Sequence, residues 1–239
     1  DKEAILDRAA VLSGEGYRCA KLKVGTRDSV EDAELTREVC RRLGPSVRLR
    51  LDANRAWHYD EALVFAHGIG DCAVDYIEEP LRDPHDLPRF FEETGMPYAL
   101  DETLQESAWL LGAEGIRSFL KQEPPVWTQA KAWVWKPTLT HEPCLREVLC
   151  AGAKEHGMNV VISASFESGV GIAALARMAA SVSGPNLPAG LDTYAWLADD
   201  VLRDRLPLGG GSVDIALVSA AAQQVEVEKL GLVYDGEEK

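Results

Sequence analysis

Six charged side chains stand at the ends of short apolar segments, and their chemical types could support metal-assisted proton transfer. They are three lysines and three carboxylates: Lys21 and Lys23 in CAKLKVG, Asp52 in VRLRLDAN, Glu78 in DYIEEP, Asp101 in YALDET and Lys136 in AWVWKP. Carboxylate oxygens suit Mg²⁺, with Mn²⁺ as an alternative ion. An amine near such a cation can act as an acid or a base. Taken singly, each carboxylate fits an ordinary surface ion pair, but three at successive segment ends favour a metal site.

The spacing of these residues indicates the elements that position them. Successive segment ends lie 29, 26, 23 and 35 residues apart, the length of a strand, a helix and two loops. A parallel β/α barrel brings the carboxyl ends of its strands to one face, where such enzymes do chemistry. We expect strands at 19–24, 47–54, 74–78, 97–101, 132–136 and 159–163, with a short last strand at 191–192. We expect helices at 3–13, 28–43, 59–69, 85–94, 106–121, 142–156 and from 170 onward.

The chain is interpreted as a single α/β domain over residues 1–239, because no linker-like segment divides it. After residue 208 come GGGS, one β-like stretch and a charged end. Residues 208–239 are therefore expected to form a peripheral tail. No G-K-[ST] follows GGGS, so we interpret it as a loop and not as a phosphate cradle.

Side chains two apart in a strand share a face, and this rule places the candidate residues. Lys21 and Lys23 share the face opposite Ala20, Leu22 and Val24, which leaves the two amines to point into the barrel. Burial and a neighbouring positive charge both lower a lysine pKa toward the range of a base. In the segment 47–54 the corresponding face is entirely polar. Such a face survives inside a barrel only when its groups are paired or bind an ion.

Composition limits the classes of function. The 239 residues include 46% apolar residues and carry a formal net charge of -14, which argues against a nucleic-acid surface. An anionic carboxylate substrate would need local positive charge from lysines or a metal. No apolar run is long enough for a membrane span, and no signal peptide is visible. Five cysteines without C-x-x-C argue against a disulfide framework or structural zinc, so we expect a soluble protein of a reducing compartment.

The motifs resemble those of the o-succinylbenzoate synthases of the enolase superfamily. The matching strings are KLKVG, RLDANRAW, IEEP, ALDET, KPTLT, VISASFESGVG and GLDTY. DANRAW and KPTLT together are more specific than any single motif, whereas IEEP alone would indicate only the superfamily. The resemblance implies an enolase-type (β/α)7β barrel and a Mg²⁺-dependent hydro-lyase of menaquinone or phylloquinone biosynthesis. The reaction would be the syn dehydration of 2-succinyl-6-hydroxy-2,4-cyclohexadiene-1-carboxylate to 2-succinylbenzoate.

The resemblance also implies a role for each candidate residue. Lys23 would remove the α proton and help the hydroxyl leave, Lys136 would stabilise the anion from the other side of the ring, and Lys21 would assist. Three carboxylates would bind Mg²⁺: Asp52, Glu78 and Asp101. Two polar residues would support that site from the second strand: Arg50 and Asn54. Four residues of the Ser/Gly-rich loop would hold the succinyl carboxylate or let the backbone approach it: Ser163, Ser165, Gly169 and Gly171.

One departure from the family pattern concerns the N-terminal side. Family members carry a capping domain and a first barrel strand before the K-x-K strand, whereas this chain starts in the helix that precedes K-x-K. We therefore expect a partial barrel, which is a fragment or one segment of a larger polypeptide. The string EETGMPYALDETL resembles a plant and algal fusion with other quinone-pathway domains. The expected compartment is the cytoplasm for a bacterial protein and the plastid for such a fusion.

Two other functions remain open on the sequence. An N-acylamino acid racemase or dipeptide epimerase could use Lys23 and Lys136 on opposite faces of its substrate. DANRAW and KPTLT favour the synthase. A non-catalytic barrel segment that only scaffolds a fusion would explain the missing cap, but the complete set of acids and lysines argues against it.

Overall fold

The computed structural model describes residues 1–120, 125–140, 144–183 and 186–231. Within them a six-stranded parallel sheet runs in chain order, each strand pairing with the next along the sequence. The strands are β1 (Cys19–Lys23), β2 (Arg48–Asp52), β3 (Val74–Glu78), β4 (Tyr98–Leu100), β5 (Ala132–Trp135) and β6 (Asn159–Ile162). The expected strands at these six places are therefore present, each within two residues of its expected ends.

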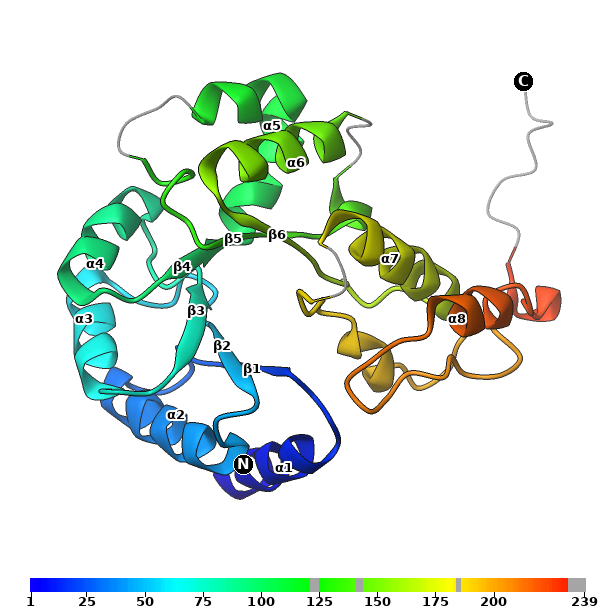
Figure 1. The fold of residues 1–239 in the computed structure, drawn as a ribbon, viewed down its shortest axis with the longest axis horizontal. Coiled ribbons are helices and arrows are strands. Elements are labelled where there is room, and N and C mark those ends of the chain that lie inside the picture. Colours follow the sequence, from blue (N-terminus) through cyan, green and yellow to red (C-terminus); the bar gives the residue numbers. More distant parts are fainter. Residues whose placement is uncertain (121–124, 141–143, 184–185, 232–239) are drawn as a thin grey trace.

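The sheet curves into an arc, and the helices cover its outer side (Figure 1). The α-helices are α1 (Lys2–Gly14), α2 (Ser29–Leu43), α3 (Tyr59–Gly68), α4 (Leu87–Thr94), α5 (Glu102–Phe119), α6 (Leu145–His156), α7 (Gly169–Val182) and α8 (Ile215–Ala221). Short 3-10 turns are η1 (Pro84–Asp86), η2 (Pro137–Leu139), η3 (Asp192–Trp196) and η4 (Val227–Lys229). No helix of the described residues is long and apolar enough to cross a lipid bilayer.

The helix α2 illustrates how local sequence sets these elements. Asp28 caps its first turn, because its carboxylate accepts hydrogen bonds from the backbone N–H groups of Val30 and Glu31. Gly44 ends it in a positive-φ conformation that glycine tolerates. Between these limits the apolar residues recur at helical spacing, and Leu35 and Leu43 are almost fully buried against the sheet.

Two apolar clusters hold the barrel together on either side of the sheet. The larger one lies between the strands and the outer helices and includes Leu49, Leu51 and Trp133. The smaller one consists of Tyr76, Ala99, Ala132, Val134 and Val161, whose positions alternate with outward-facing residues. The strands β3 to β6 therefore bury apolar side chains on both faces, as expected for a parallel sheet covered by helices. On the inward face of β1, Lys21 and Lys23 are exposed.

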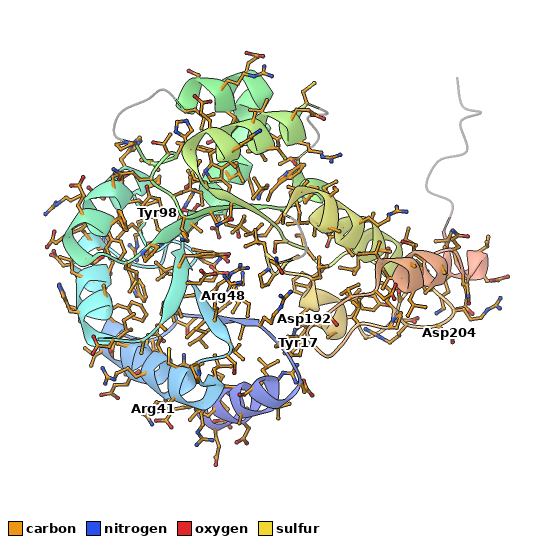
Figure 2. The ribbon with its side chains drawn as sticks, in the orientation of Figure 1. Tyr17, Arg41, Arg48, Tyr98, Asp192 and Asp204 are labelled. Atoms are coloured by element: carbon orange, nitrogen blue, oxygen red, sulfur yellow. The ribbon has the colours of Figure 1, made fainter. Side chains whose placement is uncertain are left out.

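Coil rather than a strand pair completes the ring between β1 and β6. After β6 a single parallel bridge joins Ser163 to Gly190. Farther on, the chain returns to the loop before β1, where a Cβ on Gly211 would lie only 2.4 Å from the carbonyl oxygen of Gly16. Tyr17 and Asp192 lie next to each other at this closure (Figure 2).

Three expectations from the sequence need correction. The last strand expected at 191–192 is only the bridge at Gly190, and the 3-10 turn η3 begins at Asp192. The β-like stretch expected in the tail is instead the helix α8, capped by Asp214, with Val218 fully buried. The helix expected at 106–121 begins at Glu102, since nothing separates it from the strand end at Asp101. Three other parts of the expectations lie outside the described residues: the end of the helix expected at 106–121, the start of the helix expected at 142, and the tail after residue 231.

Candidate active site

Three carboxylates stand side by side at the carboxyl ends of β2, β3 and β4. The sheet register pairs Asp52 with Glu78 and places Asp101 directly after β4. Their side chains are only 1–3% exposed. Isolated buried carboxylates are costly, so the site must supply positive charge.

Lys21 supplies part of that charge from the middle of β1. Its Nζ donates to Asp52 Oδ2 at 2.8 Å and to Glu78 Oε2 at 3.1 Å. Burial lowers the pKa of Lys21, but the negative charges of Glu78 and Asp52 outweigh burial and raise that pKa above its ordinary value. The sequence-based expectation of a lowered pKa is therefore wrong for Lys21. The charges next to its amine are mainly carboxylates, and they favour the protonated form.

Lys23 lies nearer to solvent than Lys21, with a side chain that is 64% exposed. Its Nζ donates to Asn54 Oδ1 at 2.6 Å and lies 3.4 Å from Asp52 Oδ2. Asn54 Nδ2 in turn donates to Glu102 Oε1 at 2.8 Å. The sequence analysis missed Glu102, although its position next to Asp101 in ALDET was a usable signal. The chain Lys23–Asn54–Glu102 fixes which end of the Asn54 amide faces the lysine.

Lys136 approaches from β5, on the side of the ring opposite β1. Its Nζ donates to Asp101 Oδ2 at 2.6 Å. Gln105, one turn into α5, donates to the carbonyl of Val134 at 3.0 Å and lies 3.5 Å from Asp101 Oδ1. Gln105 is a second residue that the sequence analysis missed. Lysines from both sides of the ring thus hold the carboxylates.

The donor set fits a hard divalent cation in its chemistry. Burial raises the pKa of Glu78 to about 7, even though Lys21 lowers it, and the nearby charges of Asp52 and Asp101 raise it further. A bound divalent cation would offset the repulsion among these carboxylates and stabilise their charged forms. In the described residues, however, no three acidic, His or Cys side chains are arranged as a ready metal cage, because lysine ammonium groups hold the carboxylates. It therefore stays a prediction that one ion binds to Asp52, Glu78 and Asp101.

Backbone strain is concentrated at this same face. Among the described residues, the non-glycine residues with positive φ are Asn54, Arg55, Glu79 and Phe166. Each follows the carboxyl end of a strand, namely β2, β3 or β6. Such conformations are unfavourable for residues with a side chain and persist where the surroundings enforce them, commonly at functional sites. The strain supports the assignment of this face as the site.

The Ser/Gly-rich loop after β6 holds two internal carboxylates. The backbone N–H of Ser165 donates to Glu167 Oε2 at 2.6 Å, and Glu167 also accepts from the hydroxyl of Thr138 in η2. The N–H of Gly169 donates to both oxygens of Asp200, at 3.0 and 3.2 Å. The chain's own acids thus occupy the backbone donors that were expected near a substrate carboxylate. A Cβ on Gly171 would lie 2.7 Å from Glu167 Cβ, so Gly171 gives room to this side chain.

Arg50 lies apart from the carboxylate cluster. Its Nε donates to Asp75 Oδ2 at 3.1 Å, its Nη1 donates to the carbonyl of Pro188 at 2.9 Å, and its guanidinium lies 4.8 Å from the centre of the Tyr76 ring. It shares the inward face with Asp52, as expected, but it sits two residues nearer the start of β2. In this structure its contacts therefore do not include the proposed metal ligands.

Comparison with known proteins places this geometry in a family. Residues 4–111 match the family described as enolase C-terminal domain-like. Among solved structures, MenC from Desulfotalea psychrophila and the L-Ala-D/L-Glu epimerase from Bacillus subtilis each superpose with a TM-score of 0.73 at 24% identity, over 88% of this chain and 56% of theirs. The enolase-type α/β fold expected from the sequence is confirmed.

Sequence relatives confirm the resemblance to o-succinylbenzoate synthases. The o-succinylbenzoate synthase of Pasteurella multocida is 34% identical over 208 residues, which cover 85% of this chain and 57% of that enzyme. Protein PHYLLO, chloroplastic, of Arabidopsis thaliana is 37% identical over 213 residues, which cover 83% of this chain and 12% of the plant protein. The chain thus spans little more than half the length of this bacterial relative.

Proposed function

We propose that this chain is the barrel segment of an o-succinylbenzoate synthase. The observation that carries the proposal is the pair of lysine–carboxylate clusters, with Lys21 and Lys23 at one side of the ring and Lys136 at the other. Similarity to synthases from several bacteria, at 31–36% identity, supports the substrate. The substrate is then 2-succinyl-6-hydroxy-2,4-cyclohexadiene-1-carboxylate and the product is 2-succinylbenzoate.

The proposed reaction uses the lysines for proton transfer. Lys23, in its neutral form, removes the proton from the carbon that bears the ring carboxylate, and the electron pair moves onto that carboxylate as an ene-diolate. The ene-diolate then collapses, the hydroxyl on the same face leaves with the proton from Lys23 as water, and the ring becomes aromatic. Lys136 stabilises the developing negative charge from the opposite face.

Each carboxylate of the mouth has a part in this proposal. Asp52, Glu78 and Asp101 would bind Mg²⁺, or Mn²⁺ in its place, which supplies Lewis-acid stabilisation of the negative charge. Lys21 would offset the negative charge of Asp52 and Glu78, to which its amine donates hydrogen bonds. Asn54 would orient the amine of Lys23. Ser163 and Ser165 would donate their hydroxyl groups to the succinyl carboxylate of the substrate. That role does not conflict with Glu167, because Ser165 contacts Glu167 through its backbone N–H.

The test supplies two substrate classes to the full-length protein with Mg²⁺. With the cyclohexadiene carboxylate, we expect ultraviolet absorbance of an aromatic product to grow. With an N-acylamino acid or a dipeptide in D₂O, we expect no exchange of the α hydrogen above background. Exchange without aromatic product would instead favour the epimerase alternative, which the similarity in fold to the Bacillus enzyme allows. Inactivity with both classes would favour the scaffold alternative and contradict the proposal.

We also propose that the segment works as part of a longer polypeptide. The plant relative is about eight times longer than the matched region, since that region is 12% of its length. Fusion to other quinone-pathway domains would then place this segment in a plastid, like the plant relative whose name marks it as chloroplastic. A separate bacterial synthase would work in the cytoplasm.

A further inference from the structure

Glu79, the second glutamate of IEEP, is a fully buried carboxylate that the proposed reaction does not use. Both of its oxygens accept two hydrogen bonds. Oε1 accepts from the backbone N–H groups of Asp101 and Thr103, at 2.9 and 2.8 Å. Oε2 accepts from the Thr103 hydroxyl at 2.9 Å and from Arg55 Nε at 3.2 Å. Glu79 is thus completely satisfied, which is what its burial requires.

These bonds join the ends of three neighbouring strands. The backbone of Glu79 donates to the carbonyl of Ala99 at 3.1 Å, and its own carbonyl accepts from the N–H of Arg55 at 2.7 Å. Glu79 therefore contacts the loop after β2, the end of β3 and the start of α5. Glu78 precedes Glu79 in the chain, and the N–H of Asp101 donates to its carboxylate. Asn54 precedes its partner Arg55. All three of these residues belong to the candidate active site.

The local backbone shows that this arrangement is enforced. Glu79 and Arg55 both adopt positive φ, at 40° and 57°. Asp101 has φ -122° and ψ -78°, outside the helix that begins at the next residue. A conformation of this kind is retained only where the surrounding contacts determine it. Here the contact that fixes the N–H of Asp101 is the carboxylate of Glu79.

We propose that Glu79 is a positioning residue for the divalent-cation site: it ties the backbone of Asp101 to the end of β3, so that the Asp101 and Glu78 carboxylates reach one ion together. The inference rests on the proposed function, because it requires the carboxylates at 52, 78 and 101 to bind a metal. Glu79 itself does not touch the ion. It acts through the backbone of Asp101 and through Arg55.

The test measures Mn²⁺ binding by electron paramagnetic resonance in the full-length protein without substrate. Glu79→Gln keeps the size of the side chain but replaces one acceptor oxygen with an amide group that cannot accept from these donors. We expect the Kd for Mn²⁺ to rise about tenfold, the lower end of the effect of residues that orient metal ligands. The matched control is Glu106→Gln, which removes the other carboxylate on Arg55, at 2.9 Å, without touching Asp101. Its Kd should change less than twofold.

The outcomes separate this inference from the proposed function. Absence of Mn²⁺ binding by the unsubstituted protein would overturn the metal site and this inference with it. Binding by that protein with an unchanged Kd in folded Glu79→Gln would overturn the inference alone. A purely structural role would lower the melting temperature without weakening Mn²⁺ binding by the folded protein. If Glu79→Gln does not fold, Thr103→Val removes one donor to Oε2, and equal Mn²⁺ affinity in that variant would contradict the inference.

Discussion

Two regions at the carboxyl ends of the strands neutralise buried charge in different ways. At the ends of β2, β3 and β4, buried carboxylates contact the long side chains of Lys21, Lys23 and Lys136. At the loop after β6, the backbone N–H groups of Ser165 and Gly169 are held by Glu167 and Asp200. A divalent cation bound on the first side, as proposed, would take the place of the lysine ammonium groups that hold these carboxylates. On the second side, the carboxylates of Glu167 and Asp200 already accept from the backbone N–H groups. The carboxylate of the proposed substrate would therefore bind hydroxyl groups there or displace Glu167.

The largest effect is expected on the carboxylate side, from Lys23→Ala. Removal of the proposed general base should lower kcat by about 10²–10⁴-fold. Mn²⁺ binding should change little, because Lys23 is not one of the proposed metal ligands. Single-turnover kinetics and a metal titration on the same preparation would measure both. Retained turnover would show that the exposed amine of β1 is not the base and would remove the functional difference between the two sides.

On the Ser/Gly side, Gly169→Ala should destabilise the fold. The added Cβ would lie 2.4 Å from both Asp200 Oδ2 and Leu202 Cδ1, and overpacking of this kind costs about 1–3 kcal/mol. The control is Gly14→Ala in α1, where a Cβ has nothing within 4 Å and should leave the free energy of unfolding unchanged or slightly higher. Urea denaturation would compare the pair. Equal free energies of unfolding for the two variants would mean that Asp200 does not pack closely against Gly169 at the start of α7.

Glu78→Gln should have opposite effects on stability and on metal binding. Burial raises the pKa of Glu78 to about 7, so its negative charge opposes folding at pH 8. Without divalent metal, the neutral amide should raise the free energy of unfolding by about 1–2 kcal/mol, as measured by urea denaturation at pH 8. The same variant should weaken Mn²⁺ binding. A loss of stability would show that the Lys21 contact outweighs the cost of burial.

The smallest effect is expected from Ser165→Ala. Loss of one hydroxyl donor to the succinyl carboxylate should raise KM by about tenfold, corresponding to about 1.4 kcal/mol, with kcat nearly unchanged. The backbone bond from Ser165 to Glu167 does not depend on the hydroxyl, so the loop should keep its shape. Steady-state kinetics on the proposed substrate would show the split. An unchanged KM would mean that the succinyl group binds elsewhere.

Sequence reasoning located the strands but not the partners of their end residues. Alternation and spacing place Lys21, Asp52 and Glu78 on one face, because strand geometry is local and regular. Glu79, Glu102 and Asp200 were not predicted, because their partners come from other elements of the chain. Gly169 and Asp200 are 31 residues apart, and Asn54 and Glu102 are 48 residues apart.

The same limit explains the loop after β6. The resemblance implied that Gly169 lets the backbone approach a substrate, and in this structure Gly169 makes room for the chain's own Asp200 and Leu202. A sequence motif shows that close approach is needed but not which group approaches. The α8 helix was missed for a related reason: seven residues of mixed apolar and small character fit either a strand or a helix until packing decides.

The glycine contact that closes the ring has a consequence for how the protein is made. Gly16 and Gly211 meet so closely that a methyl group on Gly211 would overlap the Gly16 carbonyl. During synthesis the ribosome must therefore deliver almost two hundred further residues before the loop ahead of β1 finds its partner. Until then the loop ahead of β1 lacks this contact, and the incomplete ring exposes apolar surface that can aggregate. Chaperone protection of the nascent chain should matter most in that interval.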